Sequence, residues 1–174
     1  DWEAQHVITV GYSNADFRNI DDALNAVAIN GWIQVLIDVA PGIYPAGMLL
    51  IPPGVHVRGS GMNATEIQGV VHIIGHLSKV KISSPVSSIL EGNASYCYFD
   101  CPVSAGDALG NTTISNCVFR DSGPGGSLTL LQTGRMSDCV INIGVTGEGT
   151  WSIKNCEINS RMALQIMSSP MTQY

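Results

Sequence analysis

Charged residues are scarce in this sequence. They make up 13% of its 174 residues, and the eight Lys and Arg residues, scattered singly, face fourteen Asp and Glu residues, which gives a net charge of −6. A chain without a basic cluster is a poor partner for nucleic acid or for an anionic membrane, so we expect neither as a partner. The sequence also lacks the run of about 18 apolar residues that a membrane-spanning helix needs.

Aromatic residues are few as well, at 6%, although hydrophobic residues make up 45% of the chain. With so few charges, the surface has to consist largely of Ser, Thr, Asn, Gln and Gly, a composition common in β-rich extracellular and viral fibrous proteins. At this length we expect one β-helix domain over residues 1–174. Within it, residues 1–31 are expected to form a strand and a capping helix, and residues 32–174 the coils.

Four segments share one short phrase, a cysteine followed by a variable residue and a large apolar residue. The phrases are residues 96–99, 116–119, 138–141 and 155–158, at steps of 20, 22 and 17, and residues 79–82 precede them by another 17 without a cysteine. An irregular period near 20 residues with short strands predicts a solenoid. Because each coil gives one residue to a given interior position, we expect an internal ladder of Cys97, Cys117, Cys139 and Cys156.

The five cysteines are an odd number, which does not fit a disulfide framework closed within the chain. We expect buried, reduced thiols and neither a metal site nor a cofactor, since metal sites favour closer Cys-x2-Cys pairs. Reduced thiols imply assembly in a reducing cytosol. That setting fits a virion assembled inside a cell better than a protein secreted through an oxidising compartment.

The first part of the chain has a different organisation. After a strand at His6–Val10, apolar residues at i, i+3, i+4 and i+7 from Ile20 predict a helix that Asn19 caps and Gly31 ends. A solenoid exposes an open core at its end, so we expect this helix to cover it. Apolar runs broken by Pro-Gly turns predict strands over residues 33–74, Gly-rich loops are expected at 123–126 and 144–149, and the total is about seven coils.

Residues 16–24, 39–44 and 51–61, in that order, resemble the opening of pectin-lyase-like right-handed parallel β-helices, as in pectin methylesterases and phage tailspikes. The resemblance implies an all-β fold, a single-stranded right-handed parallel β-helix with an N-terminal capping α-helix. It implies no single function, because this superfamily holds esterases, lyases, hydrolases, adhesins and inert structural columns. The catalytic motifs of pectin methylesterases, polygalacturonases and pectate lyases are not found in the sequence, so we expect no enzyme of these kinds.

A glycan hydrolase without those motifs still needs two carboxylates about 5–10 Å apart across a groove. The candidates are Asp100, Asp121 and Asp138, which lie in or just after neighbouring repeat phrases but at different positions around the coil. The alternative is that these acids are solvated or bonded to turn amides, as single acids at strand ends usually are.

Tyr96, Tyr98 and Trp151 are candidates for binding sugar rings, because an aromatic face suits the apolar side of a pyranose. Tyr96 and Tyr98 alternate with Cys97, so both are expected to point outward when the cysteine points inward. The alternative is packing in the core or at a subunit interface. His72 and His76 are expected to be structural, since a four-residue spacing in a strand and turn does not form a zinc pair.

Two functions from different classes remain. In the first, the chain is a non-enzymatic structural or receptor-facing β-helix on the surface of a virus or phage particle, of decoration, tailspike or fibre type. It then self-associates as a homotrimer and has other virion proteins or a cell-surface glycan as partners. In the second, it belongs to a secreted or tailspike-borne carbohydrate-active enzyme or adhesin. The acidity of the chain argues against a polyanionic substrate, although Arg58, Lys79 and Lys81 offer a small basic groove.

Overall fold

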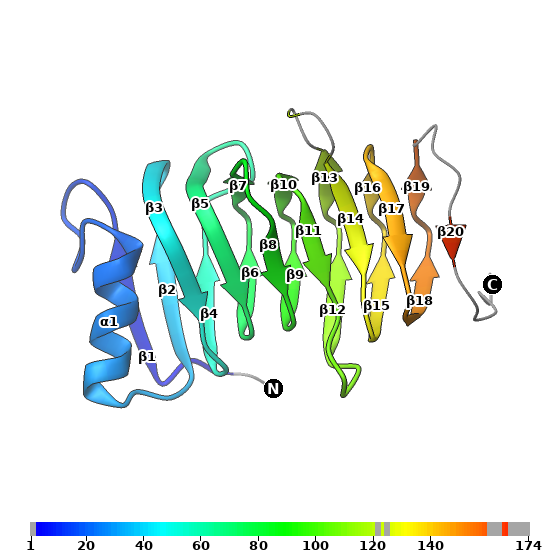
Figure 1. Cartoon of the computed structure of the whole chain (residues 1–174). Coiled ribbons are helices and arrows are strands. Elements are labelled where there is room, and N and C mark those ends of the chain that lie inside the picture. The colour runs from blue at the N-terminus through cyan, green and yellow to red at the C-terminus, as the bar shows by residue number, and fades with distance from the viewer. Residues whose placement is uncertain (1–2, 121–122, 124–125, 160–164, 167–174) are drawn as a thin grey trace.

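The strands stack side by side as a column, with one helix at its N-terminal end (Figure 1). The computed structural model describes residues 3–120, 123, 126–159 and the backbone of 165–166. The chain makes about six turns, from β2 to β17, and β18 to β20 open a further one. The predicted all-β parallel β-helix with an N-terminal helix is therefore confirmed, and the expected count of about seven coils is close to the count observed.

One sheet runs the whole length of the column. Its eight strands, in spatial order, are β1 (His6–Val10), β2 (Val35–Val39), β4 (Val55–Arg58), β6 (His76–Ser78), β9 (Asn93–Ser95), β12 (Thr112–Ser115), β15 (Thr133–Ser137) and β18 (Thr150–Lys154). Neighbouring strands come from successive turns and pair in parallel, so each turn adds about 4.8 Å to the column.

The second sheet has twelve strands and forms two walls that meet at β5 (Thr65–Ile73), which β3 (Gly42–Ile51) also pairs with. The first wall contains β7 (Lys81–Ser83), β10 (Tyr98–Asp100), β13 (Val118–Arg120), β16 (Val140–Ile141) and β19 (Glu157–Ile158). The other wall contains β8 (Ser88–Leu90), β11 (Val103–Ala105), β14 (Ser127–Leu130), β17 (Gly144–Gly147) and β20 (Gln165–Ile166). The column therefore has three outer faces.

A sharp corner joins the eight-stranded sheet to the first wall. The corner residues have a positive φ of 51° to 56° although none is glycine: Lys79, Tyr96, Asn116, Asp138 and Asn155. The residue after each corner turns inward, and it is buried at Val80, Cys97, Cys117 and Cys139. These corners are the repeat phrases of the sequence, and β10 pairs with β7 and β13 in the register that steps of 17 and 20 residues predict.

Helix α1 (Ile20–Asn30) packs against the N-terminal strands as predicted. The side chain of Asn19 accepts a hydrogen bond of 2.7 Å from the backbone N–H of Asp22 and so caps the first turn. Gly31 ends the helix in the left-handed conformation, with φ 62°. The buried side of the helix consists of Ile20, Ala23 and Val27.

The core consists of inward side chains that stack from turn to turn. In the first wall the stacked row is Ile67, Ile82, Phe99, Phe119 and Ile141, all nearly or completely buried. The rings of Phe99 and Phe119 are parallel to within 8°, with centroids 5.1 Å apart. Since strand residues alternate between faces, the neighbours of this row point outward, and they form the polar surface described below.

The Gly-rich segment 144–149 is not a loop, as the sequence suggested, because Gly144–Gly147 is strand β17 and pairs with β14. A Cβ atom on Gly147 would lie 2.5 Å from the backbone oxygen of Leu130. Glycine therefore stands there because two turns approach each other closely, and the segment belongs to the wall.

Candidate functional site

The first wall carries a group of charged side chains on its outer face, which we call the Lys81 cluster: Glu66, Lys81, Ser83 and Asp100. They come from β5, β7 and β10, where Glu66 pairs with Lys81, and Ser83 with Asp100. Their sequence neighbours Ile67, Ile82 and Phe99 are the buried stacked row. Alternation along each strand therefore places the whole cluster on one outer face.

Lys81 lies between the two acids of the cluster. Its Nζ atom is 3.9 Å from Oε2 of Glu66 and 4.0 Å from Oδ2 of Asp100, and it lies 5.8 Å from the centroid of the Tyr98 ring. The hydroxyl of Ser83 donates a hydrogen bond of 2.6 Å to Oε1 of Glu66. This hydrogen bond, a second one from the Gln68 amide and the charge of Lys81 together lower the pKa of the Glu66 carboxyl.

The Lys81 cluster does not suit general acid catalysis. Its two carboxylates lie within about 8 Å of each other, inside the range of glycoside hydrolases. Such an enzyme, however, needs one carboxylic acid that holds its proton near neutral pH, and the pKa of Glu66 moves in the opposite direction. The ammonium of Lys81 also lies within 4.0 Å of both acids, where a water or a glycosidic oxygen would react.

Two of the candidate acids from the sequence, Asp100 and Asp138, are not brought together. Asp100 belongs to the Lys81 cluster at the end of β10, while Asp138 is the exposed corner residue before β16, two turns further along the wall. Oδ1 of Asp138 accepts a hydrogen bond of 3.3 Å from the side chain of Asn155, the corner residue of the next turn. Asp121 lies outside the described residues.

The aromatic candidates lie in different surroundings. Tyr96 is a corner residue with 52% of its surface exposed, and Tyr98 is half-buried on the outer face of the first wall. Trp151, in contrast, is 9% exposed, and its Nε1 donates a hydrogen bond of 3.2 Å to the backbone oxygen of Leu131. Trp151 therefore packs in the core, the alternative left open for it, where its ring lies over Gly134 of the neighbouring strand.

The repeated cysteines lie one above another along the inner side of the corners. Cys97, Cys117 and Cys139 are buried, Cys156 is partly exposed, and all are free thiols. Each Sγ lies 3.1 to 3.3 Å from the backbone oxygen two residues earlier, across its corner. The thiols therefore fill the corner and donate to carbonyl oxygens that also accept a backbone N–H from the corner of the preceding turn.

The histidines of the column have partners within the protein. Nε2 of His72 lies 2.9 Å from a carboxylate oxygen of Glu91, and His76 contacts the hydroxyl of Ser95 at 3.1 Å. In the described part of the chain, no group of three or more His, Cys, Asp or Glu side chains could hold a metal ion. Within the same residues, no helix is long and apolar enough to cross a membrane.

The proposed basic groove of Arg58, Lys79 and Lys81 does not form. The guanidinium of Arg58 makes two hydrogen bonds of 3.2 Å with Asp38 on the eight-stranded sheet. Lys81 lies on the first wall within its cluster, and Lys79 is the exposed corner residue between these two faces. The three basic residues are close in the sequence, but the corner at Lys79 places Arg58 and Lys81 on different faces of the column.

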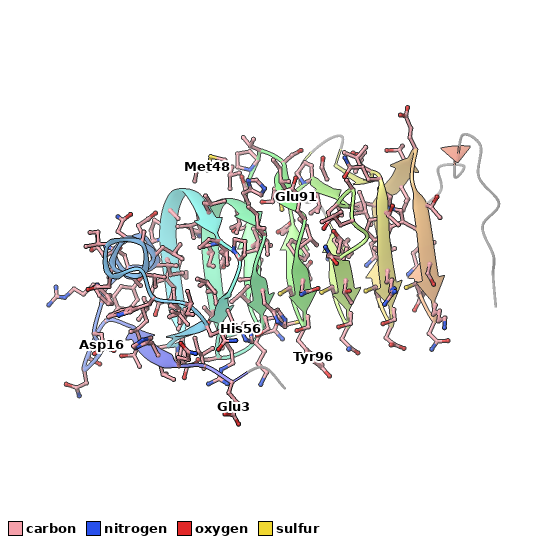
Figure 2. The ribbon with its side chains drawn as sticks, turned by 90° about the horizontal axis from the view of Figure 1, so that it is seen from below. Glu3, Asp16, Met48, His56, Glu91 and Tyr96 are labelled. Atoms are coloured by element: carbon pink, nitrogen blue, oxygen red, sulfur yellow. The ribbon has the colours of Figure 1, made fainter. Side chains whose placement is uncertain are left out.

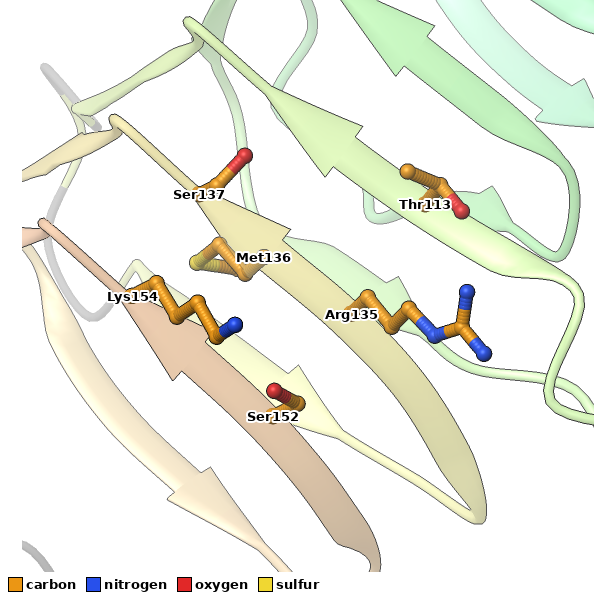
Figure 3. A pocket seen from close by; sticks show the side chains of 6 residues that line it. All are labelled: Thr113, Arg135, Met136, Ser137, Ser152 and Lys154. Atoms are coloured by element: carbon orange, nitrogen blue, oxygen red, sulfur yellow. The ribbon is translucent and has the colours of Figure 1, made fainter. Parts of the chain in front are cut away.

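A different groove lies on the outer face of the eight-stranded sheet, near the C-terminal end of the column (Figure 3). Its volume is about 360 Å³, and its lining contains Thr113, Arg135, Met136, Ser137, Ser152 and Lys154. Sequence reasoning missed it. A usable signal was that Arg135 and Lys154 precede the cysteines of their own repeats by four and two residues, so both fall on one face of neighbouring strands.

Comparisons with known proteins show similarity of fold. No protein-family model matches the sequence, and no curated protein sequence matches it. The structure is similar to that of the pectin methylesterase PemA from Erwinia chrysanthemi, with a TM-score of 0.53 at 17% identity over 90% of this chain and 55% of PemA. A pectin methylesterase solved in complex with a hexasaccharide gives a TM-score of 0.50, again at 17% identity over 90% of this chain and 55% of that one.

This chain therefore spans about half the length of the solved structures that it matches. The similarity confirms the pectin-lyase-like fold that residues 16–61 indicated in the sequence. At this level of identity it is a likeness of fold alone.

Proposed function

We propose that this chain is a non-enzymatic, self-associating β-helix protein with a structural or receptor-facing role on the surface of a virus or phage particle, as a decoration, tailspike or fibre component. The observation that carries the proposal is the use of charge in the column. Ionised side chains join one turn to the next, which is the task of a structural element. They do not face one another across an open cleft.

The ion pairs found among the described residues all connect successive turns. Arg58 reaches back to Asp38, and the Lys81 cluster joins three turns. His72 reaches forward to Glu91, in a contact that is an ion pair only when the imidazole is protonated. Each such pair contributes at most about 1 kcal/mol, since all are partly solvated. Together they fix neighbouring turns against sliding, and in the Lys81 cluster the pKa of Glu66 is lowered, opposite to what acid catalysis needs.

Self-association is supported by an apolar strip on the outer side of β3, β5 and β8, which consists of Met48, Leu50, Val70 and Ile89. Met48 is 64% exposed and Leu50 50% exposed. Register places Val70 beside Met48, and His72 between Leu50 and Ile89. In Figure 2, Met48 lies on the opposite side of the column from His56. A closed trimer buries such a strip on every subunit and limits further assembly.

The five free thiols support the setting of the proposal. Proteins that mature in oxidising compartments usually oxidise closely spaced cysteines, whereas the cytosol keeps thiols reduced. A particle that assembles in the cytosol would contain this ladder of thiols in the form found here.

The test is the solution mass under reducing conditions, by size-exclusion chromatography with light scattering. We expect about three times the chain mass of 18.4 kDa. The double variant Met48→Lys/Leu50→Lys should shift the mass toward that of one chain. The matched control is Ile29→Lys, which places the same charge on a side chain that is 84% exposed at the helix. A wild-type chain that stays monomeric at high concentration would contradict self-association.

The alternative is a carbohydrate-active enzyme or adhesin. It is favoured by the likeness to two pectin methylesterases and by the Lys81 cluster beside Tyr98. Incubation with a panel of plant, bacterial and animal glycans decides between the two functions. Turnover that disappears in Lys81→Ala but persists in Lys79→Ala would establish the enzyme and overturn the non-enzymatic proposal.

A further inference from the structure

The basic side chains in the groove between β12, β15 and β18 differ from Arg58 and Lys81, which form ion pairs between turns. Arg135 and Lys154 are both exposed on its lining. Within the described residues, neither cation has a carboxylate at ion-pair distance, whereas Arg58 and Lys81 do. Two cations without a structural partner, side by side on one groove, are available to a ligand.

Register fixes how close the two cations are. Arg135 pairs with Ser152, and Ser137 pairs with Lys154, so the two basic residues are diagonal neighbours on adjacent parallel strands. Strand spacing and rise place their Cα atoms about 8 Å apart. Figure 3 shows both side chains over the same stretch of sheet, on β15 and β18. Their charges repel each other in the free protein, and an anion between them removes that repulsion.

The rest of the lining is neutral and can form hydrogen bonds. The hydroxyls of Thr113, Ser137 and Ser152 surround the two cations, and no carboxylate is part of the lining. A guanidinium presents paired N–H groups that match two oxygens of a carboxylate or sulfate, and a lysine adds a mobile point charge. The groove therefore has the chemistry to bind one oxyanion and the hydroxyl groups next to it.

The surface that leads into the groove is also rich in hydroxyls. Ser115 and Ser137 occupy one register row on β12 and β15, and this row ends at Lys154. Further along the same row, the hydroxyls of Ser95 and Ser78 bond to His76 and His56. The hydroxyls of Ser115 and Ser137 offer hydrogen bonds one turn apart along the axis, next to the groove. An extended, hydroxylated ligand can follow such a row, which a compact ion cannot.

We propose that this groove binds an acidic group, a carboxylate or a sulfate ester, of a polysaccharide that lies along the outer face of the eight-stranded sheet. Nucleic acid is the less suitable polyanion. The net charge of the chain is −6, the groove has two cations, and no aromatic side chain lines it to stack on a base. The inference deepens the receptor-facing part of the proposed function and rests on that part for the source of the ligand.

Titration calorimetry with four probes tests the site: alginate oligosaccharides, dextran sulfate, uncharged dextran and a single-stranded DNA oligonucleotide. We expect binding to at least one of the two acidic glycans and none to uncharged dextran. Binding to alginate alone assigns a carboxylate, and binding to dextran sulfate alone assigns a sulfate ester. The variant Arg135→Ala/Lys154→Ala should weaken that binding about tenfold or more. Arg135→Lys should give a smaller loss, because it keeps the charge and removes the paired donors.

The matched control is Arg18→Ala/Arg120→Ala, which removes the same charge from two exposed residues elsewhere on the column. Thermal unfolding checks that all variants are folded. The proposal is overturned if neither acidic glycan binds, if the control loses as much affinity as the groove variant, or if DNA of equal charge binds as tightly as the glycans. Light scattering on the same samples keeps the two proposals separate, because self-association does not require an intact groove.

Discussion

The imidazole rings of His56 and His76 are stacked across two successive turns, with centroids 4.1 Å apart and planes within 8° of each other. Each ring also contacts a serine hydroxyl of the following turn, His56 with Ser78 at 2.7 Å and His76 with Ser95 at 3.1 Å. Burial, followed by the nearby His76 and Arg58, lowers the pKa of His56 from 6.5 to about 4. Burial also lowers the pKa of His76.

The stack makes the column less stable in mild acid. As the pH falls below 6.5, His56 becomes protonated in the unfolded chain. In the folded chain it stays neutral until about pH 4, so acid favours the unfolded state. We expect the free energy of unfolding to fall by about 1–2 kcal/mol over that range, a value reduced for the part of the ring that faces water. Denaturant unfolding at a series of pH values measures the loss.

Proton NMR titration assigns this effect to the pair. In His76→Gln, the charge of the neighbour is removed, so the pKa of His56 should rise. The control is His6→Gln, since His6 stacks on Trp32 and lies outside the pair. A value near 6.5 for His56 in the wild type would show that the stack does not hold the ring neutral.

The thiol ladder should be chemically inert in the folded chain. The hydrogen bond with Cys117 and burial raise the pKa of Cys139, and burial raises the pKa of the partly exposed Cys156. Because the thiolate is the reactive form, we expect iodoacetamide to modify the four buried thiols at least about tenfold more slowly than free cysteine. Cys156 should react first, since it is the least buried.

Intact-mass spectrometry counts the modified thiols over time. In denaturant all five cysteines should be modified, which controls for the reagent. Rapid modification of Cys117 or Cys139 in the native chain would mean that the corners open far more often than this packing implies.

The repeat phrases of the sequence predicted much of this fold because each phrase combines several local signals. Each corner has the same three-part pattern, as at Asn116 and Cys117. A residue that tolerates positive φ comes first, a small buried residue follows, and a strand with alternating polar and apolar residues comes last. The helix was equally predictable from the sequence, since Asn19 and Gly31 cap it through contacts within a few residues. Such signals need no knowledge of other turns.

Features that depend on contacts between turns could not be predicted from the sequence. Gly147 belongs to a strand because the backbone near Leu130 leaves no room for a side chain, and Trp151 is buried because Gly134 leaves room for its ring. The groove of Arg135 and Lys154 requires the register of two strands and the facing of both side chains. A shift of one residue reverses that facing, so the even spacing of Arg135 and Lys154 from their cysteines indicates it only once those cysteines are known to share one interior position.

The contact between Gly134 and Trp151 gives a sharp test of the core. A Cβ atom on Gly134 would lie 2.4 to 2.7 Å from atoms of the indole ring. Gly134→Ala should therefore displace the ring and destabilise the chain by about 1–3 kcal/mol. Gly47→Ala is the control, because its Cβ would meet nothing within 4 Å. Denaturant unfolding gives the stability and tryptophan fluorescence the displacement, and equal stability for both variants would refute this packing.

Lys81 separates two acids, so its loss should have an effect that depends on pH. Glu66 has a lowered pKa in the folded chain, so its contacts stabilise the fold above the unfolded value of 4.5, and that contribution disappears as the pH falls through the folded value. In Lys81→Gln, Glu66 and Asp100 face each other without the cation. We expect a loss of about 1 kcal/mol at pH 7, which shrinks toward pH 3 as the carboxylates become protonated.

Lys79→Gln removes the same charge from the adjacent corner, where no carboxylate of the described residues lies at ion-pair distance, and should cost less at both pH values. Chemical unfolding of both variants at pH 7 and pH 3 measures the difference, and a loss in Lys81→Gln that is independent of pH would show that the lysine acts through packing of its side chain against Tyr98 and not through its charge.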